Sequence, residues 1–162
     1  MKKITIYLLL LLSICQIPSL KAASSAEELQ ETRKLFKNAS YSLEHLTKFS
    51  ESAVKLDYDC YAKAYQAAGT MMEAKFEKNP FKKINRFSEG RKSLESVIKA
   101  NPENPEFRFI RLAIQLNTPK MLNYKDNIKE DSTLIKVFIN NTKHDDEDLV
   151  KMLRAFIELY SL

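Results

Sequence analysis

The side chains whose types and spacing suggest chemistry lie in one stretch of the second half of the chain. Arg108, Arg111 and Gln115 are three and four positions apart, so they share one narrow strip of a helix whose other positions are mostly apolar. An arginine in such a strip is partly buried, and it either pairs with a structural carboxylate or lines a groove that binds a carboxylate or phosphate. Tyr124 and Asn127 would complete such a groove from the following loop. The strip favours structural pairing, and these five residues are the candidate partner-binding site.

The other reactive side chains do not form a catalytic or metal-binding set. His45 and His144 each lack a second histidine or cysteine at ligand spacing, and Cys60 has no histidine within helical reach. The acids at 145–148 lack the alternating pattern of a calcium loop and instead suit the start of a helix. Two glycines in the whole chain cannot build a phosphate-binding loop. We therefore expect neither an enzyme nor a bound metal or cofactor.

The charge of the chain is positive but not concentrated enough for nucleic acid. The sequence holds 26 Lys and Arg against 21 Asp and Glu, a net charge of +5, and three of the positive charges lie in the first 22 residues, which carry no acid. The remainder therefore carries only +2, which argues against a nucleic-acid partner. Residues 75–99 hold eight basic and three acidic side chains. This stretch suits either an ordinary solvated face, which we favour, or docking on an acidic partner or anionic lipid headgroups.

The first segment has the three parts of a secretory signal. A charged start at residues 1–3 precedes an apolar run at 4–14 and mostly small residues at 19–25. The apolar run is shorter than the roughly 20 residues that a helix needs to span a bilayer. We therefore expect a signal peptide at 1–23 and a single α-helical domain at 24–162, exported to the periplasm.

Cys15 leaves a second form of export open. The run Leu12-Ser13-Ile14-Cys15 resembles a bacterial lipobox, except that Ile14 stands where a small residue is usual. One alternative is that Cys15 is lipidated and anchors the protein to the envelope, which would bring it into contact with a membrane. The other alternative, which we favour, removes Cys15 with the signal peptide. Cys60 is then the remaining cysteine, so no internal disulfide supports the fold.

The rest of the chain alternates apolar and polar residues at helical period, interrupted by proline and asparagine. The expected helices cover six stretches, the first of which divides near residue 39: 25–55, 58–76, 82–99, 104–116, 126–140 and 145–160. We therefore predict an all-α fold of six or seven helices in antiparallel hairpins, either a tetratricopeptide-like array or a compact bundle. The helix at 58–76 is apolar around most of its circumference, so we expect it to be central.

The expected core is built around this central helix. Tyr61, Tyr65 and Met72 lie on its apolar stripe and should be buried. Gly69 and the alanines of the same helix would let a neighbouring helix approach closely. The next helix should contribute one apolar face, which consists of Ile84, Phe87, Gly90, Leu94 and Val97.

Two resemblances point to a helical fold. Residues 58–102 resemble one tetratricopeptide unit, with a helix rich in Tyr and Ala, a turn, a second helix and the closing pair Asn101-Pro102. A second set of residues spans 58–136: Asn79-Pro80-Phe81, Gly90, Asn101-Pro102, Arg108-Phe109, Arg111, Gln115, Asn117, Pro119, Tyr124, Asn127-Ile128 and Asp131. This set resembles an exported helical family of unknown function from Gram-negative bacteria. The resemblance implies export and an α-helical fold, and it implies no activity.

These features together predict a function in binding. We expect an exported, periplasmic helical protein that binds another envelope protein or a peptide through a groove between its hairpins. A lipid-anchored structural protein of the envelope is the alternative, and it depends on Cys15. An enzyme is the third possibility, because the sequence holds no nucleophile–base pair, metal set or cofactor loop.

Overall fold

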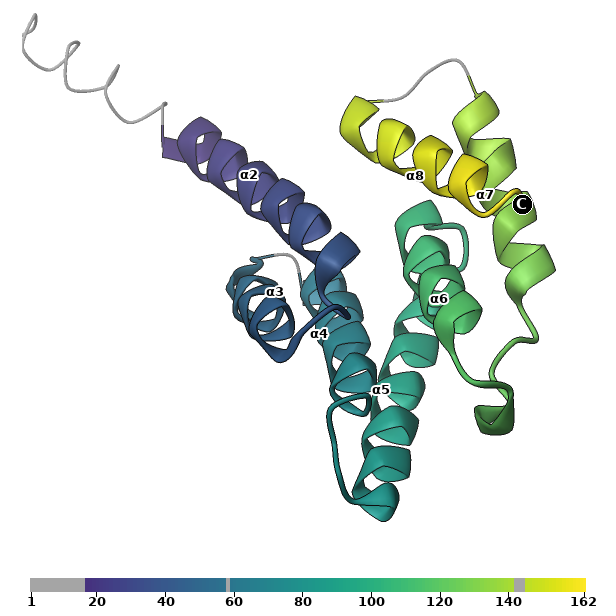
Figure 1. Ribbon diagram of the computed structural model, residues 1–162. Coiled ribbons are helices and arrows are strands. Elements are labelled where there is room, and N and C mark those ends of the chain that lie inside the picture. Colours follow the sequence, from purple (N-terminus) through teal and green to yellow (C-terminus); the bar gives the residue numbers. More distant parts are fainter. Residues whose placement is uncertain (1–16, 58, 142–144) are drawn as a thin grey trace, which may run out of the picture.

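The computed structural model describes residues 17–57, 59–141 and 145–162, and it confirms the predicted all-α fold. Within these residues the chain forms seven α-helices and one short 3-10 helix (Figure 1). Their bounds are α2 (Ile17–Asn38), α3 (Leu43–Lys55), α4 (Asp59–Glu73), α5 (Pro80–Ala100), α6 (Pro105–Asn117), η2 (Lys120–Leu122), α7 (Ile128–Asn140) and α8 (Glu147–Leu159). The apolar run at 4–14, Cys15 and His144 lie outside the described residues.

Two asparagine–proline pairs start helices rather than only interrupting them. Asn79 and Asn104 precede α5 and α6, and each side-chain oxygen accepts hydrogen bonds from two backbone amides of the first turn. Pro80 and Pro105 follow at the first helical position, where the missing N–H needs no partner. Both helices therefore begin within two residues of their predicted starts.

Consecutive helices pack on one another, and α4 and α5 form the most extensive interface. In addition, α2 packs on α3, α3 on α4, and α6 on both α5 and α7. Figure 1 shows α4 and α5 side by side, with α8 at the end of the molecule opposite the first turn of α5. The chain divides between α2 and α3 near residue 39, as the sequence predicted. None of the described helices is long and apolar enough to cross a bilayer.

The centre of the core is α4, as its apolar circumference predicts. Tyr65 is fully buried there, and Phe87 and Leu94 of α5 are buried beside it. Tyr61 and Met72 pack against this core but are only half-buried, so the prediction that they are buried is wrong for both. They lie in the first and last turns of α4, where fewer neighbouring side chains cover them.

One expected core residue, Ile84, has 54% of its surface exposed, which contradicts its predicted burial. The position at which α5 meets α4 explains the difference. A Cβ atom on Gly90 would lie 2.5 Å from Met71 Cγ and 2.6 Å from the carbonyl oxygen of Ala67, so the two helices touch there with no room for a side chain. Met71 is in the last turn of α4, and Ile84 precedes Gly90 by more than one turn of α5. Ile84 therefore projects beyond the end of α4.

Candidate functional site

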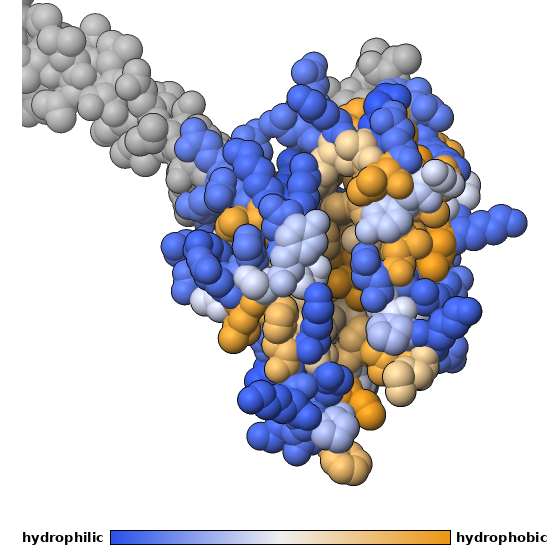
Figure 2. Space-filling model, viewed as in Figure 1, coloured by the Kyte–Doolittle hydropathy of each residue, from blue (hydrophilic) through white to orange (hydrophobic). Residues whose placement is uncertain are grey.

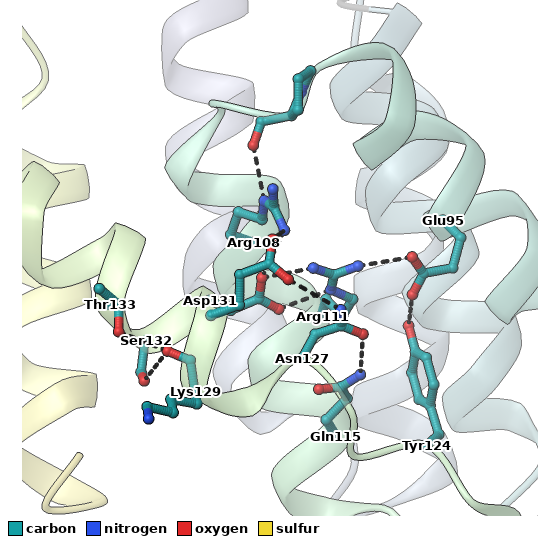
Figure 3. A network of polar contacts seen from close by, with 12 residues as sticks. Glu95, Arg108, Arg111, Gln115, Tyr124, Asn127, Lys129, Asp131, Ser132 and Thr133 are labelled. Atoms are coloured by element: carbon teal, nitrogen blue, oxygen red, sulfur yellow. Dashed lines mark hydrogen bonds and ion pairs between the residues drawn. The ribbon is translucent and has the colours of Figure 1, made fainter.

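The five residues of the candidate site belong to one network around Asp131, in the first turn of α7 (Figure 3). Arg111 binds this carboxylate through two hydrogen bonds, from Nε to Oδ2 at 2.8 Å and from Nη2 to Oδ1 at 2.7 Å. Arg108 adds a third hydrogen bond, from Nη1 to Oδ1 at 3.0 Å. Asp131 and both arginines are buried. The favoured interpretation, in which the arginine strip pairs with an internal carboxylate, is confirmed.

The same network reaches α5 and the loop before α7. Arg111 Nη1 donates to Glu95 Oε2 at 2.8 Å, and the Tyr124 hydroxyl donates to Glu95 Oε1 at 2.6 Å. Arg108 Nε donates to the carbonyl oxygen of Pro102 at 2.8 Å. The two arginines of α6 therefore hold α5, α7 and the turn between α5 and α6 in fixed positions.

Gln115 and Asn127 form the edge of this network. Gln115 Nε2 donates to Asn127 Oδ1 at 3.3 Å, and Asn127 Nδ2 donates to Glu130 Oε2 at 3.3 Å. The other amide atom of Gln115, Oε1, is buried and has no hydrogen-bond partner among the described residues. Most polar groups of the network face one another, so its geometry suits a structural clasp. Partner binding by these five residues stays a prediction.

A second buried network, which sequence reasoning missed, joins α2, α4, α6 and the start of α8. Arg33 donates from Nε and Nη2 to the two carboxylate oxygens of Glu106, at 2.8 and 2.6 Å. It also donates to both carboxylate oxygens of Asp146, at 3.2 and 2.8 Å. The Tyr65 hydroxyl donates to Glu106 Oε1 at 2.5 Å. Asp146 is in addition the N-cap of α8, because its side chain accepts the N–H of Leu149 at 2.9 Å.

The two networks shift several pKa values. Burial alone would lower the pKa of the Arg33 guanidinium, but the hydrogen bonds and negative charges of Glu106 and Asp146 raise it above its usual value. Burial and then the charge of Glu106 raise the pKa of Tyr65 well above its usual value. The pKa of Tyr124 is raised by burial and by the carboxylate to which its hydroxyl donates. Burial opposes the ionisation of Asp146, but hydrogen bonds outweigh burial and lower its pKa.

A pocket of about 580 Å³ lies between α3 and the turn that joins α4 to α5. Leu43, Leu46 and Phe76 provide its apolar lining, and Glu51 and Lys78 are among its charged residues. The sequence predicts a groove between hairpins but does not place it here, because the pocket depends on the angle at which α3 meets the α4–α5 turn. Helical periodicity within each segment carries no information about that angle.

No protein-family model, curated protein or solved structure matches the chain. The resemblances to a tetratricopeptide unit and to an exported helical family therefore stay predictions. The function has to be argued from the geometry of the pocket and of the two networks.

Proposed function

We propose that the protein is exported and that it binds a short segment of another protein in the pocket between α3 and the α4–α5 turn. The observation that supports this proposal is that apolar side chains at the pocket remain exposed to solvent. Leu43 lines the pocket with 59% of its surface exposed, and the half-buried Phe76 lines it as well. Exposed apolar side chains around a concave site are typical of sites that bind ligands or peptides.

The charges of the pocket define which peptide would suit it. Three glutamates, one lysine and one arginine are among the lining residues, and Glu73 and Arg86 neutralise each other in an ion pair. Glu51 makes no ion pair within the described part of the chain. The expected ligand places a large apolar side chain against Leu43 and Phe76, with a lysine or arginine beside it that faces Glu51.

The walls of the pocket are fixed before any ligand arrives. Leu46 reaches from the pocket into the core, and Phe49 on the same helix is fully buried, so α3 is held firmly against α4. Gly69 of α4 lies against the Phe49 ring, which keeps the two helices close. A peptide therefore meets a formed site, and binding does not carry the cost of ordering the pocket.

Export rests on the first segment of the sequence rather than on the folded domain. The charged start, the apolar run and the small residues before α-helical periodicity support a signal peptide at 1–23. The alternative, a lipid-anchored structural protein of the envelope, requires lipidation of Cys15. Both forms present the same domain to other proteins of the envelope, so the peptide-binding proposal holds for either.

The proposal is tested with a library of random 12-residue peptides displayed on phage and selected on the purified protein. We expect enrichment of sequences that place a large apolar residue next to a basic one. A synthetic peptide of the enriched sequence should lose binding to a Leu43→Asp variant, because a carboxylate then stands at the apolar rim. Leu43 is the first residue of α3, where the helix dipole favours a negatively charged side chain. Its side chain is also exposed, so the substitution to aspartate should leave the fold intact.

The matched control is Leu159→Asp, which changes another exposed leucine far from the pocket. This variant should bind the selected peptide like the parent. Glu51→Lys should reverse the charge preference, so that a second selection enriches acidic residues beside the apolar one. Failure to enrich any common sequence, or equal binding by both leucine variants, would show that the pocket does not bind peptides.

A further inference from the structure

The first turns of α5 form an exposed end of the molecule that is both apolar and basic. Figure 1 shows them at the lower end of the fold, away from α8, and Figure 2 shows hydrophilic and hydrophobic surface mixed at the same end. Phe81 is 77% exposed, and Ile84 is exposed as well. We name this surface the α5 tip, and its residues are Lys78, Phe81, Lys82, Lys83 and Ile84.

The side chains of the three lysines of the α5 tip do not contribute hydrogen bonds or ion pairs to the described part of the fold. Lys78, Lys82 and Lys83 are exposed, and their side-chain amines make no hydrogen bond or ion pair with a described residue. The neighbouring basic residues differ in this respect. Lys75 donates to the carbonyl oxygen of Ser40, and Arg86 is paired with Glu73. Glu77 accepts the N–H of Asn79, and its negative charge also interacts with Lys82 at a longer range than an ion pair. The tip therefore presents three exposed lysine amines, of which Lys82 is partly balanced by Glu77.

The placement of these charges opposes the stability of α5. The first turn of a helix favours acidic side chains, because the helix dipole is positive there. The helices α3, α4, α6, α7 and α8 all have an acid in the first turn. The first turns of α2 and α5 have none, and that of α5 carries Lys82 and Lys83 instead. Departures from local rules concentrate at functional sites, and binding to an anionic surface would give these two lysines a role.

We propose that the α5 tip docks on the surface of a bilayer that contains anionic phospholipids. Phe81 and Ile84 are three positions apart on the helix, so their side chains project from neighbouring positions of one face and enter the interfacial layer together. Lys82 and Lys83 lie between them in the sequence, and their long flexible side chains would extend from the flanks of the helix toward the phosphate groups. This combination of apolar side chains with adjacent lysines is how peripheral proteins hold an anionic membrane surface.

A lipid surface fits the tip better than an acidic protein does. The tip is a projecting end, and of its residues only Lys78 also lines the pocket described above. A stable protein partner would need roughly 800 Å² of complementary surface on each side, with a well-packed centre. Two neighbouring apolar side chains with exposed lysines around them are too small to provide such a centre. A fluid bilayer interface needs no matched shape, only depth for the apolar groups and phosphates for the lysines.

The experiment is co-sedimentation of the purified protein with lipid vesicles. One set contains phosphatidylglycerol and phosphatidylcholine, and the other contains phosphatidylcholine alone. We expect binding to the anionic vesicles, weak binding to the neutral ones, and loss of binding as the salt concentration is raised. The double variant Lys82→Gln/Lys83→Gln should bind anionic vesicles roughly 25-fold more weakly, since each lysine near such a surface contributes about fivefold. Phe81→Ser should weaken binding by about tenfold or more.

The matched control is Lys92→Gln/Lys99→Gln, which removes two exposed lysines from later turns of the same helix. This variant should bind anionic vesicles like the parent. The lysine variant should melt at the same temperature as the parent or higher, because it relieves repulsion with the helix dipole, and Phe81→Ser should change the melting temperature little because Phe81 is exposed. They should also keep the binding of pocket peptides, so the two proposals can fail separately. Equal binding to both vesicle sets, equal losses in the two double variants, or capture of an acidic protein in place of vesicles would overturn the membrane proposal.

Discussion

Arg33 on α2 and Asp146 at the start of α8 are joined by two hydrogen bonds, although 113 positions separate them in the sequence. The Asp146 side chain is 41% exposed, whereas Arg33 is buried between Asp146 and Glu106. The pair therefore has one partner that water and protons can reach and one that they cannot. This asymmetry makes the contribution of the pair to stability measurable by mutation and by pH.

Asp146→Asn should cost about 1 kcal/mol of unfolding free energy at neutral pH, because the ion pair is lost and the carboxylate is partly screened by water. Asparagine caps helices as well as aspartate, so the start of α8 is preserved. The folded state lowers the pKa of Asp146, so the stabilisation is present above the unfolded pKa of about 3.9 and is lost as pH falls through the folded pKa. Urea unfolding between neutral pH and about pH 2 should show the parent and the variant converging in acid. If the unfolding free energies of the parent and the variant differed by the same amount at every pH, the Asp146 carboxylate would not be the source of the stabilisation.

Tyr65→Phe should make the protein less sensitive to alkaline unfolding. Tyrosines of the unfolded chain ionise near pH 10, whereas the raised pKa of Tyr65 keeps its hydroxyl protonated in the folded state. The folded state then holds a proton that the unfolded state releases, so stability is complete below about pH 10 and falls above it. Unfolding free energy measured from about pH 8 to 12 should fall less steeply in the variant. Tyr41→Phe, which changes an exposed tyrosine, should follow the parent.

Arg111→Ala should lower the melting temperature clearly, because the fully buried Asp131 would lose two arginine hydrogen bonds and keep only the one from Arg108. Breaking a buried ion pair by removing one partner costs about 3–5 kcal/mol. Lys92→Ala, on the exposed face of α5, should change the melting temperature little. Calorimetry of the two variants compares them directly. An Arg111→Ala variant that melts like the parent and loses a partner would make the arginine strip a binding site instead.

Gly90→Ala and Gly69→Ala should have opposite effects, although both replace a glycine within a helix. A Cβ atom on Gly90 would meet the Ala67 carbonyl oxygen at 2.6 Å and the Met71 N atom at 2.9 Å, and backbone cannot move aside. We expect a loss of about 1–3 kcal/mol or more. A Cβ atom on Gly69 meets Ser50 Oγ at 3.2 Å, a side-chain contact that can adjust. The higher helix propensity of alanine, about 1 kcal/mol, should leave this variant neutral or stabilised in chemical unfolding.

Export is checked on the protein isolated from the cell envelope. N-terminal sequencing should find a mature chain that begins at residues 23–26, because the small residues there suit a signal peptidase. Intact-mass measurement distinguishes this form from one that begins at an acylated Cys15. A chain that still begins at Met1 would remove the signal-peptide prediction, and an acylated Cys15 would establish the lipid anchor.

The arginine strip shows what a single sequence can predict. Arg108 and Arg111 interrupt an apolar helix at helical spacing, so burial and a need for carboxylate partners follow from local pattern alone. The same logic predicts the helices themselves and the central place of α4. Tyr124 and Asn127 were expected near the strip because the loop that carries them follows it directly, and the network includes both.

The buried carboxylates that pair with Arg111 and with Arg33 were not predictable in the same way. Asp131 and Glu106 stand in the first turns of α7 and α6, where an acid already has an explanation in the helix dipole. Their burial comes from which helices face each other, and local periodicity does not contain that information. The predicted burial of Ile84 is wrong for the same reason, since the exposure of this residue depends on where α4 ends relative to α5. The signal that was available is the position of Glu106 directly before Phe107, at the start of a mostly apolar helix.

The length of chain between interacting residues also sets an order of events in folding. Residues of α4 and α5 that pack together are near neighbours in the sequence, so this hairpin closes with little loss of loop entropy and should form early. Because the chain is synthesised from its N-terminus, Arg33 emerges before Glu106 and long before Asp146. Its guanidinium stays incompletely paired until the start of α8 has emerged. We expect native-state hydrogen exchange to find α8 opening at lower free energy than the α4–α5 hairpin. The amides of the hairpin would stay protected after the contact between Arg33 and Asp146 has opened.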